Sequence, residues 1–270
     1  MSNIIMSITT QTRNAEGLRF QIGTSGFMTS QKQWLKCKSM NCIELNSSFY
    51  RIPSDKVIQN LLKLPEHVKI ICKVSKYITH IKRLKDVHDA FQLFWSQISK
   101  LGNRLTCILI QLPPSFMQTE VNMLRLLDLH TIVPDINVAV EFRHDSWLND
   151  KTYDLFRKLN WCIVGTLISK RSRTNWIGNM PNGLFIPPKT SNISYLRIHA
   201  KQGWKGEISF KEMINIRNEL VKQKVRTTFV MFNNTFFEKR NTSKIINTEL
   251  IKFSAVYDAS IFASQIINKI

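Results

Sequence analysis

Residues 41–53 read Asn41-Cys-Ile-Glu-Leu-Asn-Ser-Ser-Phe-Tyr-Arg-Ile-Pro53, and this stretch sets the architecture predicted for the chain. Its beginning is typical of a buried strand and its end of a turn. Glu44, Asn46 and Ser48 fall on one face at a period of two, and two apolar residues fall on the other. A buried carboxylate needs a partner or a shifted pKa. The pattern therefore predicts a polar face inside a sheet.

A second stretch repeats this design. Val138-Ala-Val-Glu-Phe-Arg-His-Asp-Ser-Trp147 puts Glu141 and Arg143 on one face of an apolar strand. We interpret both stretches as barrel strands whose lumen face carries polar groups.

Eight strands are predicted along the chain, with helix-like segments between most of them. This order predicts an α/β protein with a single (β/α)8 TIM-type barrel. An open doubly wound sheet is the alternative, and the count of eight and the polar lumen favour closure. Residues 1–18 are polar and are expected to form a disordered tail, which leaves 19–270 as one barrel domain. The irregular stretch 168–192 predicts a functional or mobile loop.

The net charge of +19 is the strongest compositional signal. It favours an anionic partner, with nucleic acid first and a phosphorylated small molecule second. The alternative is a solvated basic surface without a specific partner.

Five cysteines without CxxC spacing, three of them inside apolar strand runs, are typical of a reducing cytosol. The chain contains no apolar run of about 18 residues, so no membrane span is expected. These features predict a cytoplasmic protein.

Polar residues cluster toward the carboxyl ends of the predicted strands, where barrel enzymes build their sites. Three of these residues are cations and two are carboxylates, so the cluster is expected to attract an anion. The alternative is that the ion pairs only fill the lumen. The lumen candidates are Glu44, Asn46, Lys73, Gln111, Glu141, Arg143, Arg197 and His199, with His80 and His144 nearby.

Basic residues follow several of the strands and would rim the same face. Interleaved tryptophans would make this rim suitable for a phosphate backbone with splayed bases. Three further cations precede the eighth strand and would lie on the opposite face, so the bias toward one face is incomplete. The nucleic-acid-binding candidates are Lys82, Arg83, Lys170, Arg171, Arg173 and Lys201.

Other chemistries are weakly supported. His80, His144 and His199 with the two carboxylates could offer metal ligands, but no HxH or HExxH spacing is present and the interleaved cations oppose a metal. No GxSxG motif marks a serine hydrolase. No Walker or dinucleotide pattern assigns a cofactor.

Taken in order, the motifs over roughly residues 19 to 245 resemble the YecE-like family, domain of unknown function family 72. The matching segments are Ile22-Gly-Thr-Ser-Gly26, Glu44-Leu-Asn-Ser-Ser-Phe-Tyr-Arg-Ile-Pro53, Lys73, Thr79-His80, Arg83-Leu84, Gln111-Leu-Pro-Pro114, Glu141-Phe-Arg-His144, Ser146-Trp147, Tyr195-Leu-Arg-Ile-His199, Phe232-Asn-Asn234 and Asn241. The resemblance implies a (β/α)8 barrel and adds Asn233 to the candidate substrate-binding residues. Its architecture is distantly similar to that of apurinic endonucleases and sugar isomerases, which is a fold-level analogy.

The chain departs from the family's usual pattern on the loop side of the site. Thr166 stands near a usual Asp, Ala200 replaces a Gly after His199, and residues 235–240 replace a Gly- and Ala-bearing loop. These changes are consistent with an altered substrate or with lost catalysis.

Two functions from different classes follow. The first is an enzyme acting on a phosphate-bearing or nucleic-acid substrate. In it Lys73, Arg143 and Arg197 hold the phosphate. Glu44 or Glu141 acts as general base, with His80 or His199 as acid or orienting group. Asn46, Gln111 and Asn233 complete the substrate contacts. The second is a non-catalytic binder of nucleic acid or another polyanion, using the basic rim.

Overall fold

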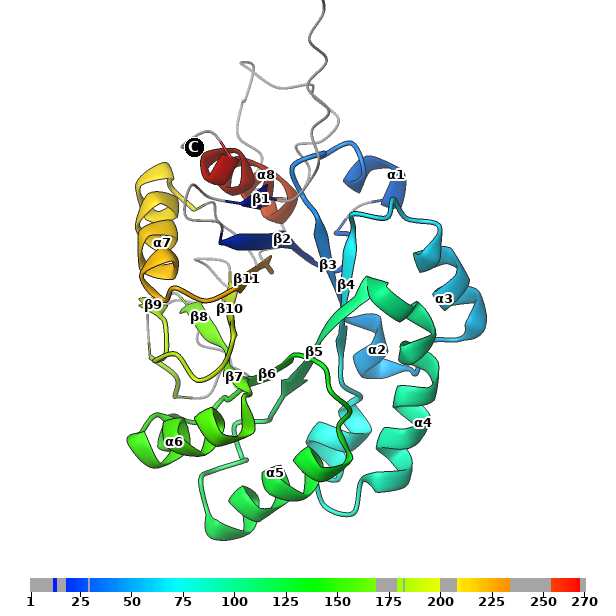
Figure 1. Ribbon diagram of the computed structural model, residues 1–270, viewed down its shortest axis with the longest axis vertical. Coiled ribbons are helices and arrows are strands. Elements are labelled where there is room, and N and C mark those ends of the chain that lie inside the picture. Colours follow the sequence, from blue (N-terminus) through cyan, green and yellow to red (C-terminus); the bar gives the residue numbers. More distant parts are fainter. Residues whose placement is uncertain are drawn as a thin grey trace, which may run out of the picture.

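The computed structural model describes residues 12–13, 18–28, 30–168, 179–181, 183–199, 208–233 and 254–267 of the 270-residue chain. The fold is mixed α/β: one curled, mostly parallel sheet occupies the centre, and helices lie outside it (Figure 1). All described strands belong to this sheet. They are β1 (Thr12–Arg13), β2 (Arg19–Ser25), β3 (Cys42–Leu45), β4 (Lys69–Lys73), β5 (Leu105–Gln111), β6 (Val138–Glu141), β7 (Cys162–Ile163), β8 (Gly165–Ile168), β9 (Gly183–Phe185), β10 (Ile193–Ile198) and β11 (Thr227–Phe232).

The parallel strands lie side by side in chain order. From β7 the sheet runs through β6, β5, β4, β3 and β2 to β11, β10 and β8. A doubly wound sheet reverses its strand order at a switch point. The described strands show no such reversal, so the doubly wound alternative is wrong.

The sequence predicts the sixth strand over residues 161–167, and in the structure the two halves of this stretch contact different neighbouring strands. Residues 162–163 (β7) pair with β6, and residues 165–168 (β8) pair with β10. The one residue between them, Val164, donates its backbone N–H to the carbonyl of Val140 at 2.9 Å. One continuous stretch of chain therefore contacts two strands that are far apart in the sheet order.

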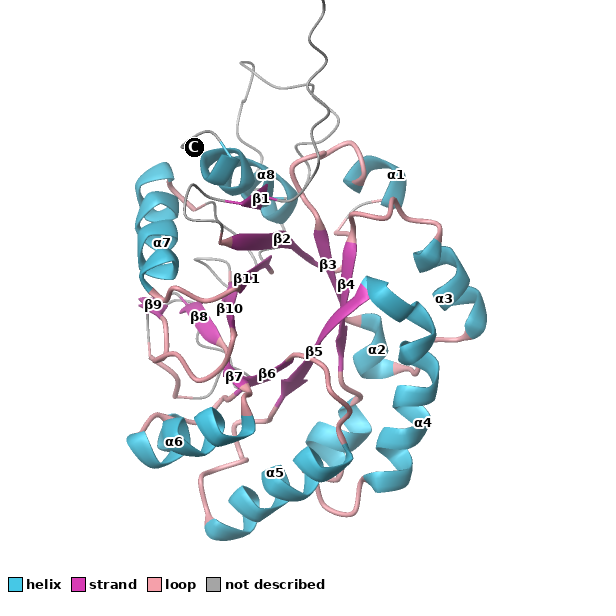
Figure 2. Cartoon of the chain, in the orientation of Figure 1, coloured by secondary structure: helices cyan, strands magenta, loops and turns pink. Residues whose placement is uncertain are grey.

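The helices lie on the outside of the curled sheet (Figure 2). They are α1 (Gln31–Trp34), α2 (Ser47–Tyr50), α3 (Asp55–Leu62), α4 (His88–Ile98), α5 (Glu120–Ile132), α6 (Asp150–Leu159), α7 (Phe210–Lys222) and α8 (Ser254–Ile267). The side chains of Thr119, Asn149 and Ser209 cap α5, α6 and α7 by accepting backbone N–H bonds. No helix among the described residues has the length and apolarity needed to cross a membrane.

Three segments differ from the sequence expectation or extend it. The sequence of residues 31–40 is compatible with a short helix, and the helix found there, α1, ends at Trp34. The irregular stretch 168–192 contributes β9, which pairs antiparallel with β8; residues 169–178 and 182 lie outside the described residues. The predicted tail contributes β1, which pairs antiparallel with β2. The disorder predicted for the rest of that tail stays a prediction.

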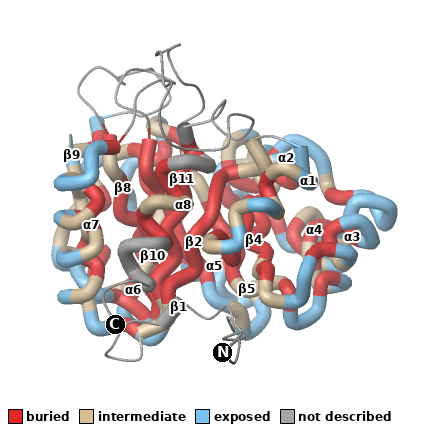
Figure 3. The backbone as a smooth tube through the Cα atoms, turned by 90° about the horizontal axis from the view of Figure 1, so that it is seen from above, coloured by how far each residue is buried: buried red, intermediate tan, exposed pale blue. Residues whose placement is uncertain are grey.

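Two apolar clusters pack on opposite faces of the sheet because successive strand residues point to opposite sides. The outer cluster contains residues such as Phe20, Ile22 and Ile43 and lies against the helices. In Figure 3 the strands are buried and exposed segments lie on the outer helices. The inner cluster fills the hollow of the curled sheet with Cys42, Ile71, Cys107, Leu109, Ala139, Cys162, Val164, Ile193, Tyr195, Phe229 and Met231.

Three thiols belong to this inner cluster: Cys42, Cys107 and Cys162. They are at most 3% exposed, and all five cysteines of the chain are free. Burial raises the pKa of each of the three thiols, so they stay protonated and behave as small apolar groups.

Gly23 allows β2 and β3 to approach each other closely. A Cβ atom at this position would lie 1.6 Å from the carbonyl oxygen of Cys42. No side chain can be accommodated against a backbone atom at that distance. The pairing of Gly23 with Cys42 therefore requires glycine.

Gly23→Ala is expected to lower the free energy of unfolding by about 3 kcal/mol or more, because the clash involves backbone and cannot be relieved by a rotamer change. Urea denaturation followed by circular dichroism measures this. The matched control is Gly102→Ala, where φ is +54° and the added Cβ meets open space. That control is expected to lose about 1–3 kcal/mol, from backbone strain alone and without a steric clash. Equal losses would contradict the packing argument.

Candidate functional site

Polar side chains converge at the carboxyl ends of the parallel strands, as the sequence predicted. In barrel-type α/β folds this is the face where chemistry is built. Each of six strands contributes one such side chain from its last two residues: Ser25 (β2), Glu44 (β3), Lys73 (β4), Gln111 (β5), Glu141 (β6) and Arg197 (β10).

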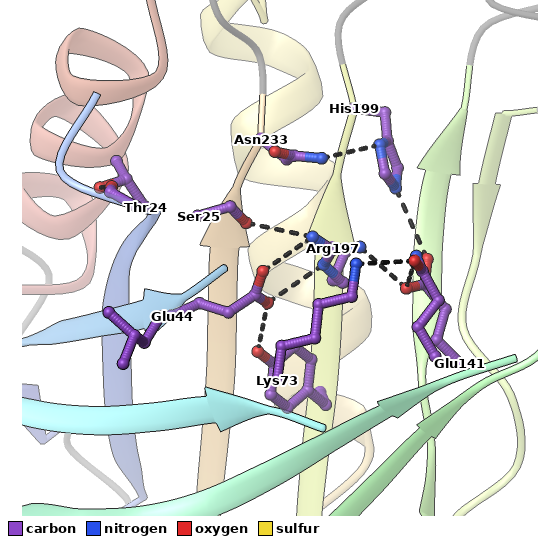
Figure 4. A network of polar contacts seen from close by, with 12 residues as sticks. Thr24, Ser25, Glu44, Lys73, Glu141, Arg197, His199 and Asn233 are labelled. Carbon is purple, nitrogen blue, oxygen red and sulfur yellow. Dashed lines mark hydrogen bonds and ion pairs between the residues drawn. The ribbon is translucent and has the colours of Figure 1, made fainter. Parts of the chain in front are cut away.

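The Arg197 guanidinium lies between the two carboxylates and binds both (Figure 4). Its Nε and Nη2 donate to Glu44 Oε2 and Oε1 at 3.1 and 2.7 Å, and Nη1 donates to Glu141 Oε2 at 2.8 Å. Arg197 is 2% exposed and both glutamates are fully buried. Burial disfavours the charged guanidinium, but Glu141 and Glu44 raise the pKa of Arg197 above its usual value. Arg197 is therefore a permanent cation that fixes both acids.

Two hydroxyl groups complete the surroundings of this bridge. The Tyr195 hydroxyl donates to Glu44 Oε2 at 2.6 Å, and the Ser25 hydroxyl accepts from Arg197 Nη2 at 3.3 Å. Burial and the Glu44 carboxylate raise the pKa of Tyr195 well above its usual value, so it stays a donor. Glu44 is thereby held by three donor groups from Tyr195 and Arg197, which lie two residues apart on β10.

Glu141 is the second anchor of the site. Arg143 Nη2 lies 2.5 Å from its Oε1, and Gln111 Nε2 donates to its Oε2 at 2.6 Å. Burial opposes ionisation of this carboxyl, but the guanidinium groups of Arg143 and Arg197 hold its pKa well below the usual range. Glu141 is therefore ionised at neutral pH and accepts hydrogen bonds.

Lys73 differs from the two arginines because it pairs with neutral groups. Its Nζ donates to Gln111 Oε1 at 2.7 Å and lies 4.1 Å from the centre of the Phe49 ring. Among the described residues, none forms an ion pair with Lys73. Burial, together with the charge of Arg197, lowers the pKa of Lys73 to about 7. Its ammonium and amine forms therefore coexist at neutral pH.

Gln111 links this lysine to the carboxylate. Its Oε1 accepts from Lys73 while its Nε2 donates to Glu141 Oε2. The backbone position of Lys73 is fixed as well. Its carbonyl and that of Leu45 lie 2.7 and 2.6 Å from the Ser48 hydroxyl, so α2 is attached to the ends of β3 and β4.

Two histidines stand beside the charged groups in neutral form. Burial lowers the pKa of His199 and of His80 to about 4 each. His199 Nε2 lies 3.7 Å from Glu141 Oε1, and its Nδ1 lies 3.4 Å from Asn233 Nδ2. Because Asn233 Nδ2 is a donor, Nδ1 accepts and the ring proton sits on Nε2, facing the carboxylate. His199 can thus donate a hydrogen bond from Nε2 while uncharged.

His80 lies on a π-helix that spans Tyr77–Ile81 and begins four residues after the end of β4. Its Nδ1 lies 2.9 Å from the Thr79 hydroxyl, and its ring packs edge-on against Phe49 at 5.0 Å between ring centroids. Lys73 contacts the same phenyl ring. Single π-helical turns occur frequently at functional sites. His80 therefore lies on the Lys73 side of the site.

Other predicted residues lie elsewhere. Asn46 does not continue the strand, because β3 ends at Leu45 and the chain turns into α2. Its buried Oδ1 has no hydrogen-bond partner among the described residues. His144 Nδ1 accepts the backbone N–H of Ser146 and so caps a local turn. No described cluster of three or more histidine, cysteine or acidic side chains is placed to hold a metal ion.

The predicted basic rim is only partly described. Lys82 is half-buried and Arg83 exposed after the π-helix, and no interaction in the described part of the chain joins them to the lumen charges. The remaining rim candidates, Lys170, Arg171, Arg173 and Lys201, lie outside the described residues.

Sequence reasoning missed Tyr195 and Phe49 as members of the site. Tyr195 precedes Arg197 by two residues on β10 and so shares its face, which the period of two could have shown. Phe49 lies on α2, a short helix that the sequence indicated only as a turn. Its contact with Lys73 depends on how α2 returns toward β4.

Comparison with known proteins identifies the family. The protein-family model described as "Protein of unknown function DUF72" matches residues 26–247. The chain belongs to the DUF72 family. The resemblance inferred from the sequence motifs is therefore confirmed.

Relatives of known sequence or structure agree with this assignment. UPF0759 protein YunF of Bacillus subtilis (strain 168) is 26% identical over 219 residues, which cover 71% of this chain and 76% of that protein. A DUF72 family crystal structure from Thermotoga maritima MSB8 has a TM-score of 0.71 at 26% identity and covers 91% of this chain and 98% of its own. Another, from Enterococcus faecalis V583, has a TM-score of 0.69 at 17% identity, covers 92% and 97% respectively, and shows the fold alone.

Arg197→Met is expected to lower the free energy of unfolding by about 3–5 kcal/mol, because it leaves two buried carboxylates without their shared cation. Tyr195→Phe removes one hydrogen bond to the same Glu44 carboxylate and is expected to lose about 1.5–3 kcal/mol. Urea denaturation of both variants gives the comparison. A smaller loss for Arg197→Met than for Tyr195→Phe would show that Arg197 is not the central cation.

Lys73→Met is expected to change how stability depends on pH. The pKa of Lys73 is lowered to about 7 in the folded protein, against about 10.4 in an unfolded chain. Between these values the unfolded state binds more protons, so native stability rises with pH, by up to about 1.4 kcal/mol per pH unit. Urea denaturation at pH 6.5, 7.5 and 8.5 tests this. The variant should be the more stable protein at pH 6.5, and its advantage should shrink as pH rises. Parallel curves would contradict the lowered pKa.

Proposed function

We propose that this DUF72 protein is an enzyme that acts on a small phosphate-bearing substrate held at the carboxyl ends of the strands. One observation carries the proposal: the buried charges do not balance. Three cations face two carboxylates, and the third cation, Lys73, has only neutral partners among the described residues. A buried cation without a counterion is unfavourable. An anionic substrate would supply the missing charge.

Lys73 marks the side from which an anion would approach. It is 8% exposed, whereas Arg143 and Arg197 are each 2% exposed. Arg197 is engaged by the two carboxylates and Ser25. The phosphate would therefore lie near Lys73 and be stabilised by the field of both arginines.

Proton transfer is best supported for Lys73, which titrates near neutrality. His199 would donate a hydrogen bond from Nε2 while uncharged. Glu44 and Glu141 were predicted as general bases, and that prediction stays open. The hydrogen bonds and ion pairs that engage both carboxylates support an orienting role instead.

A non-catalytic polyanion binder is the second candidate, and the net charge of +19 favours it. It would use the basic rim, of which Lys82 and Arg83 are described.

We also infer that the sheet closes as a (β/α)8 barrel. The pairing of β7 with β6 and of β8 with β10, with one residue between them, supports this closure. The inner cluster, which fills the hollow of the sheet with apolar side chains, supports it too.

Sulfate is a suitable probe of the anion site because it stays fully ionised at neutral pH. Its affinity, measured by isothermal titration calorimetry between pH 6 and 9, is expected to fall as pH rises through about 7, where Lys73 loses its proton. Lys73→Met is expected to weaken binding at pH 6 and to abolish the pH dependence. Pairs of buffers with different ionisation enthalpies would reveal proton uptake on binding.

Lys82→Ala combined with Arg83→Ala is the matched control, since these cations have no described interaction with the lumen charges. This variant should bind sulfate as the wild type does. Binding that is independent of pH and unchanged in Lys73→Met would sink the proposed site. Steeply salt-dependent binding of short nucleic acids, lost in the control variant and kept in Lys73→Met, would establish the polyanion binder instead.

A further inference from the structure

The Lys73 amine group combines features that suit a nucleophile. It lies at the carboxyl end of β4, is mostly buried, and is held by the Gln111 amide oxygen and the Phe49 ring. No carboxylate among the described residues forms an ion pair with it. Two buried arginines share the site, and neighbouring cations favour the neutral amine.

We propose that Lys73 forms an imine with an aldehyde or ketone group of the substrate, so that the substrate class is a small phosphorylated carbonyl compound. The inference rests on the proposed function, because it assigns the reacting group of the same anionic substrate. Imine formation also requires a neutral amine, whereas a purely electrostatic contact with phosphate does not.

The chemistry balances without any further reactant. The nitrogen lone pair of the neutral amine attacks the carbonyl carbon and forms a C–N bond, while the carbonyl π electrons move to oxygen. One amine proton passes to that oxygen and gives a carbinolamine. The hydroxyl then leaves as water with the second amine proton, and the nitrogen lone pair forms the C=N bond. Protonation of the imine gives an iminium. The iminium carries the same single positive charge as the original ammonium, so the attraction for the phosphate is kept.

The surroundings supply what each step requires. About half of Lys73 is neutral at pH 7, given its pKa of about 7. An exposed lysine is neutral in roughly one molecule in 2,500 at that pH. His80, uncharged and packed on the same Phe49 ring, stands on the Lys73 side and can exchange a proton with the departing oxygen. Gln111 contacts the amine without giving it a negative charge, which keeps the pKa low.

Borohydride trapping tests the proposal on the full-length protein. The protein is incubated at pH 7 with dihydroxyacetone phosphate, glyceraldehyde 3-phosphate or unphosphorylated glyceraldehyde. Sodium borohydride then reduces any iminium to a stable secondary amine, and peptide mass spectrometry locates the adduct. Labelling of Lys73 is expected to exceed that of exposed Lys76 in the same sample by at least about tenfold. Equal labelling of the two lysines would overturn the proposal.

The pH profile and two variants separate a reactive lysine from an accessible one. Labelling of Lys73 should rise through pH 7 and then level off, whereas that of Lys76 should keep rising to about pH 10. Lys73→Arg keeps the positive charge and should lose the adduct. Gln111→Glu places a carboxylate against the amine, so labelling at pH 7 should fall at least about tenfold and recover at higher pH. An unchanged profile in Gln111→Glu would count against the inference, and thermal melting confirms that each variant is folded.

The probes also distinguish this inference from the proposed function. Preference for the phosphorylated compounds and competition by sulfate support both. Labelling of Lys73 by glyceraldehyde without any effect of sulfate would leave the imine standing and remove the anion site. Binding of dihydroxyacetone phosphate in calorimetry, without a trapped adduct at Lys73, would leave the anion site standing and remove the imine.

Discussion

The contact between Arg197 and two fully buried carboxylates is the constraint on which the site depends. Replacing such an ion pair by apolar residues is often neutral or stabilising, so its presence is poor support for a purely structural role. The inner cluster of the same sheet illustrates the apolar alternative, because residues such as Leu109, Phe229 and Met231 fill the hollow without any charge. The charges are confined to the end where the strands finish. That segregation is expected of a site and not of a core.

Because Arg197 binds both carboxylates, the hydrogen-bond partners of the remaining polar groups are largely determined. Glu141 also contacts Arg143 and Gln111, and its hydrogen-bonded link to Lys73 runs through Gln111. Gln111 turns its amide so that its oxygen faces the lysine and its nitrogen faces the carboxylate. Lys73 is left with neutral partners and exists in both protonation states at neutral pH. Burial, together with the charge of the Arg197 guanidinium on another strand, produces this lowered pKa.

Much of this could be read from the chain before its structure was known. The period of two placed Glu44, Glu141 and Arg197 on the lumen face, because strand geometry fixes the side on which a residue lies. The same rule failed at Asn46, since it holds only while the strand continues and β3 ends one residue earlier. Thr166, which stands near a position where the family usually has Asp, is buried in register with Arg197 and adds no charge. Which cation would lack a carboxylate depends on distances across the lumen, and sequence spacing does not encode them.

The three thiols under the charged layer have a consequence of another kind. Cys42, Cys107 and Cys162 are buried within the sheet, and their high pKa keeps them as thiols. An alkylating reagent attacks thiolates, so it reaches them only after the sheet has opened. Because alkylation is irreversible, the modified fraction accumulates with time, at a rate set by the population of the open state when reclosing is faster than alkylation. The three native thiols, on three different strands, therefore act as built-in reporters of how readily the sheet opens.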